Sequence, residues 1–172
     1  MLNKDKAKLI RKELKEELGL TSRQVSVRTS GSAIRCEIKD LNVSKREVEE
    51  VANKQEHYRK DFATGEILLG GNTFINVVYN WNIVKEESQK YKELIEKKVN
   101  GTDSNHIKLA ESKDGKAEAI YNRDFDQIET WVSVPGRDED WKSMSKRYLA
   151  SNIDNMAQVI VELMANYKME II

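Results

Sequence analysis

The amino-acid sequence predicts an α+β protein, and three observations carry that prediction. Apolar residues recur every three or four positions from about Asn3 to Leu18 and again toward the end of the chain, which is typical of amphipathic helices. Apolar and polar residues alternate between Gln24 and Asp40, as they do in strands with one buried face. Two turn signals, Gly70-Gly71-Asn72 and Asp114-Gly115, each separate short apolar runs, which indicates paired strands.

The first half, residues 1–80, is expected to form an α-β-β-α-β(β) module. Its first helix should run from about Asn3 to Leu18 and end at Gly19, because glycine adopts a left-handed conformation at little cost. Two strands should follow at Gln24–Thr29 and Ser32–Asp40, joined at Ser30-Gly31. Each of these strands is predicted to bury one face, because its apolar residues occupy every second position.

The second helix and a buried strand should complete this module. Ser44 and Glu47 have capping-box spacing, so each side chain is expected to bond the other residue's backbone N–H, and the helix should reach about residue 55 or 58. Two extended segments between Asp61 and Trp81 should meet at the Gly70-Gly71-Asn72 turn. Thr73–Tyr79 is apolar at most positions of both alternating sets, which predicts a central strand covered on both faces.

The second half, residues 81–172, is expected to pack with this module and to contain a β-hairpin. Asp114-Gly115 at the centre of the connection predicts a type I′ turn. That register places Leu109 opposite Ile120 and Glu111 opposite Glu118. The pair of glutamates should be exposed, with its repulsion relieved by Lys113 and Lys116.

Two helices and a further strand should complete the second half. The helices are expected at about Asn82–Lys98 and Asp138–Tyr167, and the strand at Thr130–Val134. The apolar seam of the last helix is either the main core contact of this half, which we favour, or a helix–helix interface that would make the protein a homodimer rather than a monomer. The seam consists of Leu149, Ile153, Met156, Ile160, Leu163 and Tyr167.

Composition narrows the classes of function. Apolar residues make up 39% of the 172 residues, which is enough for a folded core. Lys plus Arg and Asp plus Glu both number 29, which excludes binding of nucleic acid through bulk charge but leaves room for a local basic face. The single cysteine, Cys36, excludes an internal disulfide framework and a cysteine-based zinc site. Without a long apolar segment or an apolar leader, the chain is expected to be cytoplasmic.

Several basic residues are candidates for contact with nucleic acid or with a partner protein. Arg28 and Arg35 are expected on the outer face of the first hairpin, where they can meet phosphates. The alternative, which we favour from the sequence, is a surface of cross-strand ion pairs that uses Glu37. The candidate residues are Arg23, Arg28, Arg35, Arg59 and Lys60.

One acidic cluster lies near a predicted strand. The cluster consists of Asp124, Asp126 and Glu129, which stand just before the predicted strand Thr130–Val134. Paired carboxylates can hold Mg²⁺ for phosphodiester chemistry. A metal-dependent nuclease ordinarily carries further acidic or basic groups at set spacings, and none is recognisable here. Nucleophilic sets, Gly-rich phosphate loops and metal-spaced His pairs are also absent from the sequence. We therefore assign no catalytic residue, metal or cofactor, and a non-enzymatic protein is the favoured interpretation.

The N-terminal half resembles a known family. The resemblance covers roughly Lys6 to Tyr79, and it is carried by Ser26-Val27-Arg28, the strand around Ile34, the helix at Val48–Ala52 and, above all, Thr64–Phe74 with Tyr79. The most specific positions are Gly65, Glu66, Gly70, Gly71 and Asn72. Together these segments look like a small module of phages, plasmids and integrative elements that is catalogued among the large polyvalent protein-associated domains.

The resemblance implies a mobile-element protein that disarms a host defence in the bacterial cytoplasm, and it supplies no established catalytic residues. On that basis we expect an anti-CRISPR protein that inhibits an RNA-guided nuclease, most plausibly of the Cas9 type, by binding the nuclease or its guide RNA complex. Two alternatives stay open. The first is a nucleic-acid-binding accessory protein of a phage or plasmid, and the second is a weak metal-dependent nuclease.

Overall fold

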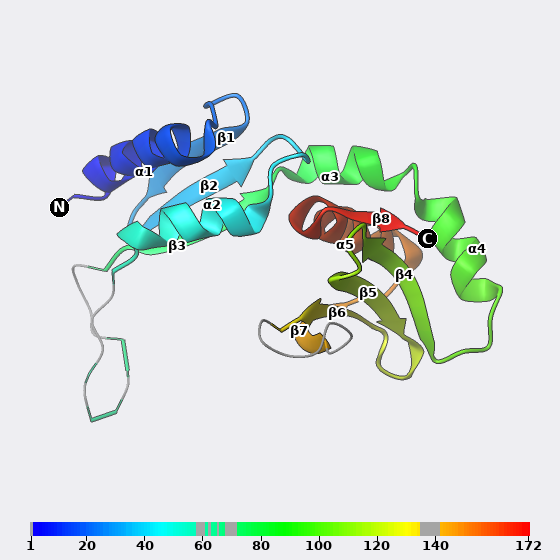
Figure 1. The fold of residues 1–172 in the computed structure, drawn as a ribbon. Coiled ribbons are helices and arrows are strands. Elements are labelled where there is room, and N and C mark those ends of the chain that lie inside the picture. Colours follow the sequence, from blue (N-terminus) through cyan, green and yellow to red (C-terminus); the bar gives the residue numbers. More distant parts are fainter. Residues whose placement is uncertain (1, 58–60, 62, 65, 68–71, 135–141) are drawn as a thin grey trace. The chain divides into compact units, whose positions relative to one another are not determined.

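The computed structural model describes residues 2–57, 61, 63–64, 66–67, 72–134 and 142–172 and confirms the predicted α+β class (Figure 1). The chain divides into two compact units, Met1–Asn80 and Trp81–Ile172. A three-stranded sheet belongs to the first unit and a five-stranded sheet to the second. Each unit therefore builds a hydrophobic core between its own sheet and its own helices.

The first unit follows the predicted order of elements. It contains α1 (Asn3–Leu18), β1 (Val25–Ser30), β2 (Ala33–Ile38), α2 (Lys45–Ala52), the 3₁₀ turn η1 (Asn53–Gln55) and β3 (Phe74–Tyr79). The sheet order among the described strands is β1-β2-β3, with β1 antiparallel and β3 parallel to β2. β2 is thus the central strand, and the prediction that Thr73–Tyr79 would be central is wrong. The predicted turn at Gly70-Gly71 lies outside the described residues.

Both helices of this unit lie on one face of its sheet. α1 packs against β1, α2 packs against β3, and the two helices touch each other (Figure 1). Val27, Cys36 and Val77 lie side by side across the three strands, and all are buried. Asn76 on β3 is exposed, so β3 is covered on one face and the prediction of two covered faces is wrong. Its alternating apolar residues at Phe74 and Val78 are half-buried rather than buried.

The helix ends in this unit have different physical origins. Gly19 ends α1 as predicted, with a φ of 68° that only glycine adopts without strain. α2 begins after Ser44 as predicted, but the Ser44 side chain makes no capping hydrogen bond. Instead, the hydroxyl of buried Tyr79 accepts a hydrogen bond from the Lys45 N–H (3.1 Å) and donates one to the Val43 carbonyl oxygen (3.1 Å). A tertiary contact from β3 has therefore taken over the predicted role of the capping serine.

The described residues of the second unit form three α-helices and a five-stranded antiparallel sheet. Its elements are α3 (Trp81–Ser88), α4 (Lys92–Asn100), β4 (His106–Ser112), β5 (Ala117–Asn122), the 3₁₀ turn η2 (Arg123–Phe125), β6 (Gln127–Ser133), β7 (Lys142–Leu149), α5 (Ile153–Tyr167) and β8 (Met169–Ile171). The strand order is β7-β6-β5-β4-β8. Ile160 and Leu163 of α5 lie in one core with Leu109 and Ile128 of the sheet, which confirms that the seam of the last helix is a core contact.

The single helix predicted at Asn82–Lys98 is wrong, because α3 and α4 are separate helices. The hydroxyl of buried Ser88 donates to the Lys85 carbonyl oxygen (2.8 Å), so it competes with the backbone at the end of α3. The N–H groups of Lys90 and Tyr91 then bond carbonyl oxygens three residues earlier. These short-range bonds close a tight turn where the prediction continued the helix.

The predicted start of the C-terminal helix is also wrong. Residues 142–149 form strand β7, and α5 begins only at Ile153. The Asn152 side chain accepts a hydrogen bond from the Asn155 N–H (2.8 Å), which is a regular N-cap. Leu149 is 73% exposed at the end of β7 and does not belong to the apolar seam. Antiparallel pairing of β7 with β6 therefore outweighs the helical spacing of its few apolar residues.

The β4–β5 hairpin confirms one predicted pair and contradicts the other. Glu111 lies opposite Glu118 as predicted, but a bulge at Leu109 leaves Ile120 opposite Lys108. In the connecting turn, Gly115 has a φ of 69° while Asp114 has no positive φ, so the predicted type I′ turn is wrong.

Lysines other than the predicted pair relieve the repulsion between these glutamates. Lys108 Nζ lies 2.9 Å and Lys142 Nζ lies 3.1 Å from Glu118 Oε2, and both lysines also reach Glu111 (3.2 and 3.8 Å). Lys142 belongs to β7, two strands away from β5, so sequence spacing gives no sign of its role. The predicted partners Lys113 and Lys116 instead pair with Glu170 and Asp114.

The Tyr79 hydroxyl gives the first testable prediction. Tyr79→Phe removes the acceptor for the Lys45 N–H and the donor to the Val43 carbonyl oxygen, so we expect a loss of about 1 to 2 kcal/mol in the free energy of unfolding of the first unit. Urea denaturation followed by circular dichroism measures this loss. Tyr91→Phe is the matched control, because the Tyr91 hydroxyl makes a marginal 3.5 Å bond to Glu87. Equal stability of the two variants would contradict the assigned role of Tyr79.

Candidate nucleic-acid interface

The face of the three-stranded sheet that α1 and α2 leave uncovered carries two adjacent arginines. Arg28 of β1 lies directly opposite Arg35 of β2, and Asn76 of β3 follows Arg35 in the same row. All three residues are exposed. Like charges directly opposite each other on a sheet repel. This row, which we call the arginine row, therefore favours an anionic ligand.

The charge of the arginine row is only partly neutralised. Arg35 Nη2 lies 3.7 Å from Glu37 Oε1 on the same strand, and both side chains are at least partly exposed. Glu37 lies opposite Ser26 rather than opposite Arg28, so the predicted cross-strand bridge does not reach Arg28. Within the described part of the chain, Arg28 has no ion-pair partner. Exposed ion pairs contribute about 0 to 1 kcal/mol, so a phosphate can compete with Glu37 for Arg35.

An aromatic residue lies beside the arginine row. Phe74 of β3 is paired with Ala33 of β2, one row from Arg35 and on the same face of the sheet. Its side chain is half-buried. Nucleobases stack on such rings irrespective of sequence, while neighbouring cations hold the backbone. The uncovered face thus combines both kinds of contact that single-stranded nucleic acid uses.

The structure brings together two of the five basic candidates. Arg23 is exposed in the turn before β1, five residues from Arg28 and so roughly 16 Å away along the strand direction. It lies at the opposite end of β1 from the Ser30–Ala33 connection and outside the arginine row. Arg59 and Lys60 lie outside the described residues.

The motif that carries the family resemblance is described only in part. Gly65, Gly70 and Gly71 lie outside the described residues, whereas Glu66 and Asn72 are described. The Glu66 carbonyl oxygen accepts a hydrogen bond from the Asp61 N–H (2.7 Å). The Asp61 carboxylate accepts bonds from the N–H groups of Thr64 (2.9 Å) and Ala63 (2.8 Å), and these bonds hold its pKa below the usual range. The described part of the motif is therefore a turn closed by an aspartate.

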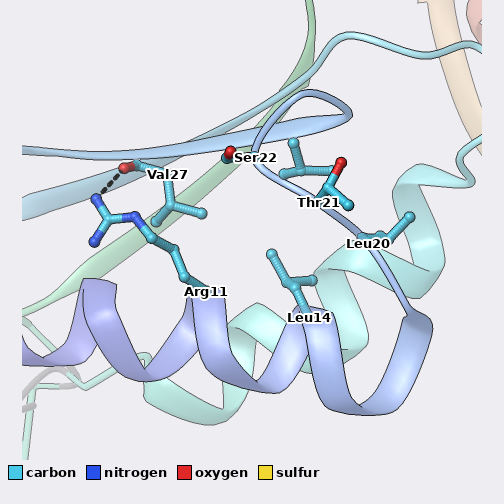
Figure 2. Close-up of a pocket in the computed structure, with 7 residues that line it drawn as sticks. Arg11, Leu14, Leu20, Thr21, Ser22 and Val27 are labelled. Atoms are coloured by element: carbon cyan, nitrogen blue, oxygen red, sulfur yellow. Dashed lines mark hydrogen bonds between the residues drawn. The ribbon is translucent and has the colours of Figure 1, made fainter.

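The hollow between α1 and β1, on the helix-covered side of this sheet, is small. It has a volume of about 50 Å³, and Leu14 and Leu20 are among the residues that line it (Figure 2). Arg11 reaches across from α1 and donates a hydrogen bond to the Val27 carbonyl oxygen of edge strand β1 (2.5 Å). Ligand pockets are usually about 300 to 1,000 Å³, so this hollow has room for little more than solvent.

The three acidic candidates do not converge on one point. Asp126 Oδ1 accepts a hydrogen bond from the hydroxyl of Tyr121, whose side chain lies in the core; burial and this bond raise the pKa of Tyr121. Glu129 lies on the opposite face of the sheet, next to core residue Ile128. The described residues contain no group of three or more His, Cys, Asp and Glu side chains that could hold a metal ion. Asp124, Asp126 and Glu129 therefore do not build the metal centre that the nuclease alternative requires.

Glu129 instead holds a structural network that sequence reasoning missed. It is 5% exposed, and its carboxylate accepts hydrogen bonds from Asn122 Nδ2 (3.1 Å) and Trp131 Nε1 (3.2 Å). Arg147 Nε of β7 lies 4.0 Å from the same carboxylate. A buried carboxylate of this kind must be paired because removing it from water is costly. The sequence places Glu129 just before the predicted strand Thr130–Val134, but its partners Asn122 and Arg147 come from two other strands of the sheet.

The single thiol is not a nucleophile. Cys36 is completely buried between the sheet and the helices of the first unit, and burial raises its pKa to about 11. The thiol is therefore protonated at neutral pH.

Neither a family model, nor a curated protein, nor a solved structure matches the chain. In the part of the chain that the structure describes, no helix is long and apolar enough to cross a membrane.

The Glu129 network gives the second testable prediction. Glu129→Ala leaves the Trp131 indole N–H without its acceptor and removes the carboxylate acceptor of the Asn122 amide, which then has only His106 Nε2 (3.2 Å), so we expect a loss of about 1 to 3 kcal/mol in unfolding free energy. Asp124→Ala is the control and should change stability by less than about 0.5 kcal/mol. Thermal denaturation and urea titration both report the difference. If Glu129→Ala unfolds like the parent protein, the carboxylate has no structural role.

Proposed function

We propose that the protein is a non-enzymatic anti-defence protein that inhibits an RNA-guided nuclease of the Cas9 type, and that the arginine row of its N-terminal unit binds the phosphates of the guide RNA. The single observation that carries the phosphate contact is the exposed pair formed by Arg28 and Arg35, in which Arg28 has no anionic partner among the described residues. The anti-defence setting is supported by the sequence resemblance of residues 6–79 to a mobile-element module.

The chemistry of the row suits RNA phosphates. A guanidinium presents a planar fork of donors that matches phosphate oxygens, and Arg28 and Arg35 place two such groups side by side on adjacent strands. Guided nucleases hold their RNA in strongly basic channels, so an inhibitor that grips exposed guide RNA competes directly with the nuclease. Such competition needs no bond making or breaking.

A second candidate function rests on the same observation, the exposed pair of Arg28 and Arg35. A nucleic-acid-binding accessory protein of a phage or plasmid would also use the arginine row and Phe74, but it would bind free RNA or DNA without affecting a nuclease. The weak-nuclease alternative has less support, because the carboxylates of Asp126 and Glu129 are hydrogen-bonded to different residues.

The third testable prediction concerns the salt dependence of RNA binding. In the double variant Arg28→Ala/Arg35→Ala we expect weaker binding to single-stranded RNA and a slope of log K against log salt that is shallower by about 1.4, which corresponds to about two phosphate contacts. Fluorescence anisotropy at several salt concentrations measures both quantities. Lys8→Ala/Lys15→Ala is the matched control, because it removes the same charge from the exposed side of α1. An unchanged slope in the arginine variant would remove these residues from the interface.

The fourth prediction tests inhibition itself. With a panel of purified Cas nucleases loaded with guide RNA, the protein should suppress target-DNA cleavage by at least one member, and the arginine double variant should suppress it about tenfold less well. The lysine double variant should inhibit like the parent. Full cleavage by every nuclease in the panel, combined with retained RNA binding, would assign the accessory function instead. Mg²⁺-dependent shortening of guide RNA by the protein alone would contradict a non-enzymatic mechanism.

A further inference from the structure

The uncovered face of the three-stranded sheet is a grid of nine side chains, three from each strand. Strand pairing sets them in three rows, and neighbouring rows lie about 7 Å apart along the strands. The middle row is the arginine row. The row on one side of it, which we call the aromatic row, consists of Ser30, Ala33 and Phe74, and the row on the other side consists of Ser26, Glu37 and Val78. An RNA strand therefore meets different surroundings on the two sides of the arginines.

The row that contains Glu37 is unfavourable for an RNA strand. Glu37 is the only carboxylate among these nine residues, and its side chain is partly exposed. It repels any phosphate that lies beyond Arg35 on that side. A nucleotide whose phosphates lie on Arg28 and Arg35 keeps clear of this charge when its base extends toward the aromatic row.

The aromatic row provides a platform for one base. Phe74 of β3 is half-buried, so its neighbours hold the ring while part of its surface stays open to solvent. The residue beside it on β2 is Ala33, whose single methyl group is too short to cover the ring. Bases stack on aromatic side chains that are held in this way. The platform is therefore next to the two guanidinium groups and on the side away from Glu37.

The Asn76 amide stands beside this platform. Asn76 follows Phe74 by two residues on β3, so both side chains lie on the same face, about 7 Å apart. Asn76 is exposed, and its amide bonds no other residue in the described part of the chain. An amide presents one donor beside one acceptor, which is the arrangement that matches N6 and N7 of adenine. Asn76 is thus placed to read the edge of a base that lies on Phe74.

We propose that this face binds one unpaired nucleotide of an RNA, with a preference for adenosine. The base stacks on Phe74, Asn76 bonds the base edge, and the arginine row holds the neighbouring phosphates. This nucleotide site rests on the proposed phosphate contact of the arginine row, and it adds the state and the identity of the nucleotide. Bases in a duplex are paired and stacked on one another, so their faces are closed to Phe74 and the protein should discriminate against double-stranded RNA.

Fluorescence anisotropy with the full chain and labelled RNA tests the nucleotide site. We expect a short RNA without self-complementarity to bind at least about tenfold more tightly than the same RNA annealed to its complement, because only the single strand engages Phe74 and Asn76. An adenosine pentamer should bind at least about fivefold more tightly than a cytidine or a uridine pentamer.

Substitutions separate the ring from the amide. Phe74→Leu keeps an apolar side chain but removes the ring, so it should weaken single-strand binding at least about fivefold without changing the slope of log K against log salt. Phe74→Tyr restores the ring and should recover the affinity. Asn76→Ala should bring the affinities for the three pentamers within about twofold of one another. Asn105→Ala is the matched control, an exposed asparagine of the second unit, and it should keep the preference for adenosine.

The outcomes distinguish the nucleotide site from the phosphate contact. The site is refuted if the duplex binds as tightly as the single strand, or if Phe74→Leu and Asn76→Ala both bind the adenosine pentamer like the parent. A shallower salt slope in Arg28→Ala/Arg35→Ala would then still support the phosphate contact. Weak binding by Phe74→Leu together with parent-like binding by the arginine variant would refute the phosphate contact, and with it the placement of the phosphates. Absence of binding to every one of these RNAs contradicts both.

Discussion

The parallel pairing of β3 with β2 is the constraint on which the N-terminal unit depends. Parallel neighbours cannot be joined by a tight turn, so the chain must cross over the sheet, and α2 is part of that crossover. α1 buries Ile10 and Leu14 on the same side. Both described helices of this unit lie on one face, so neither covers the other face of the sheet. The exposure of Arg28, Arg35 and Asn76 follows directly from this topology.

Tyr79 shows how the same pairing organises the helix layer. It is the last residue of β3, and its hydroxyl is bonded to the backbone on both sides of the start of α2. The strand that leaves the crossover thus fixes the point at which the crossover helix begins. A buried tyrosine needs a partner for its hydroxyl, and a helix start needs acceptors for its free N–H groups, so one contact satisfies both requirements.

The two sheets differ in how far their charged side chains are paired with opposite charges. In the five-stranded sheet, Lys108 and Lys142 are matched by Glu111 and Glu118, and Glu129 is matched by Arg147, Asn122 and Trp131. These charged side chains therefore find their partners within the sheet. In the three-stranded sheet, Glu37 reaches Arg35 but not Arg28. The whole chain has 29 basic and 29 acidic side chains, so its net charge does not reveal this contrast. An anion binds where the local charge is positive, whatever the net charge of the protein.

By itself, the sequence determined the features that depend on neighbours along the chain. The 3.6-residue spacing and Gly19 set both ends of α1, and the alternation of apolar residues identified the buried faces of β1 and β2. Only the tertiary structure decided that residues 142–149 form a strand, that β2 is central and that Asn76 completes the arginine row. The partners that Glu129 finds on β5 and β7 were decided in the same way. Each of these features joins segments that are distant in sequence, and the pairing energy of such segments does not appear in the pattern of either segment alone.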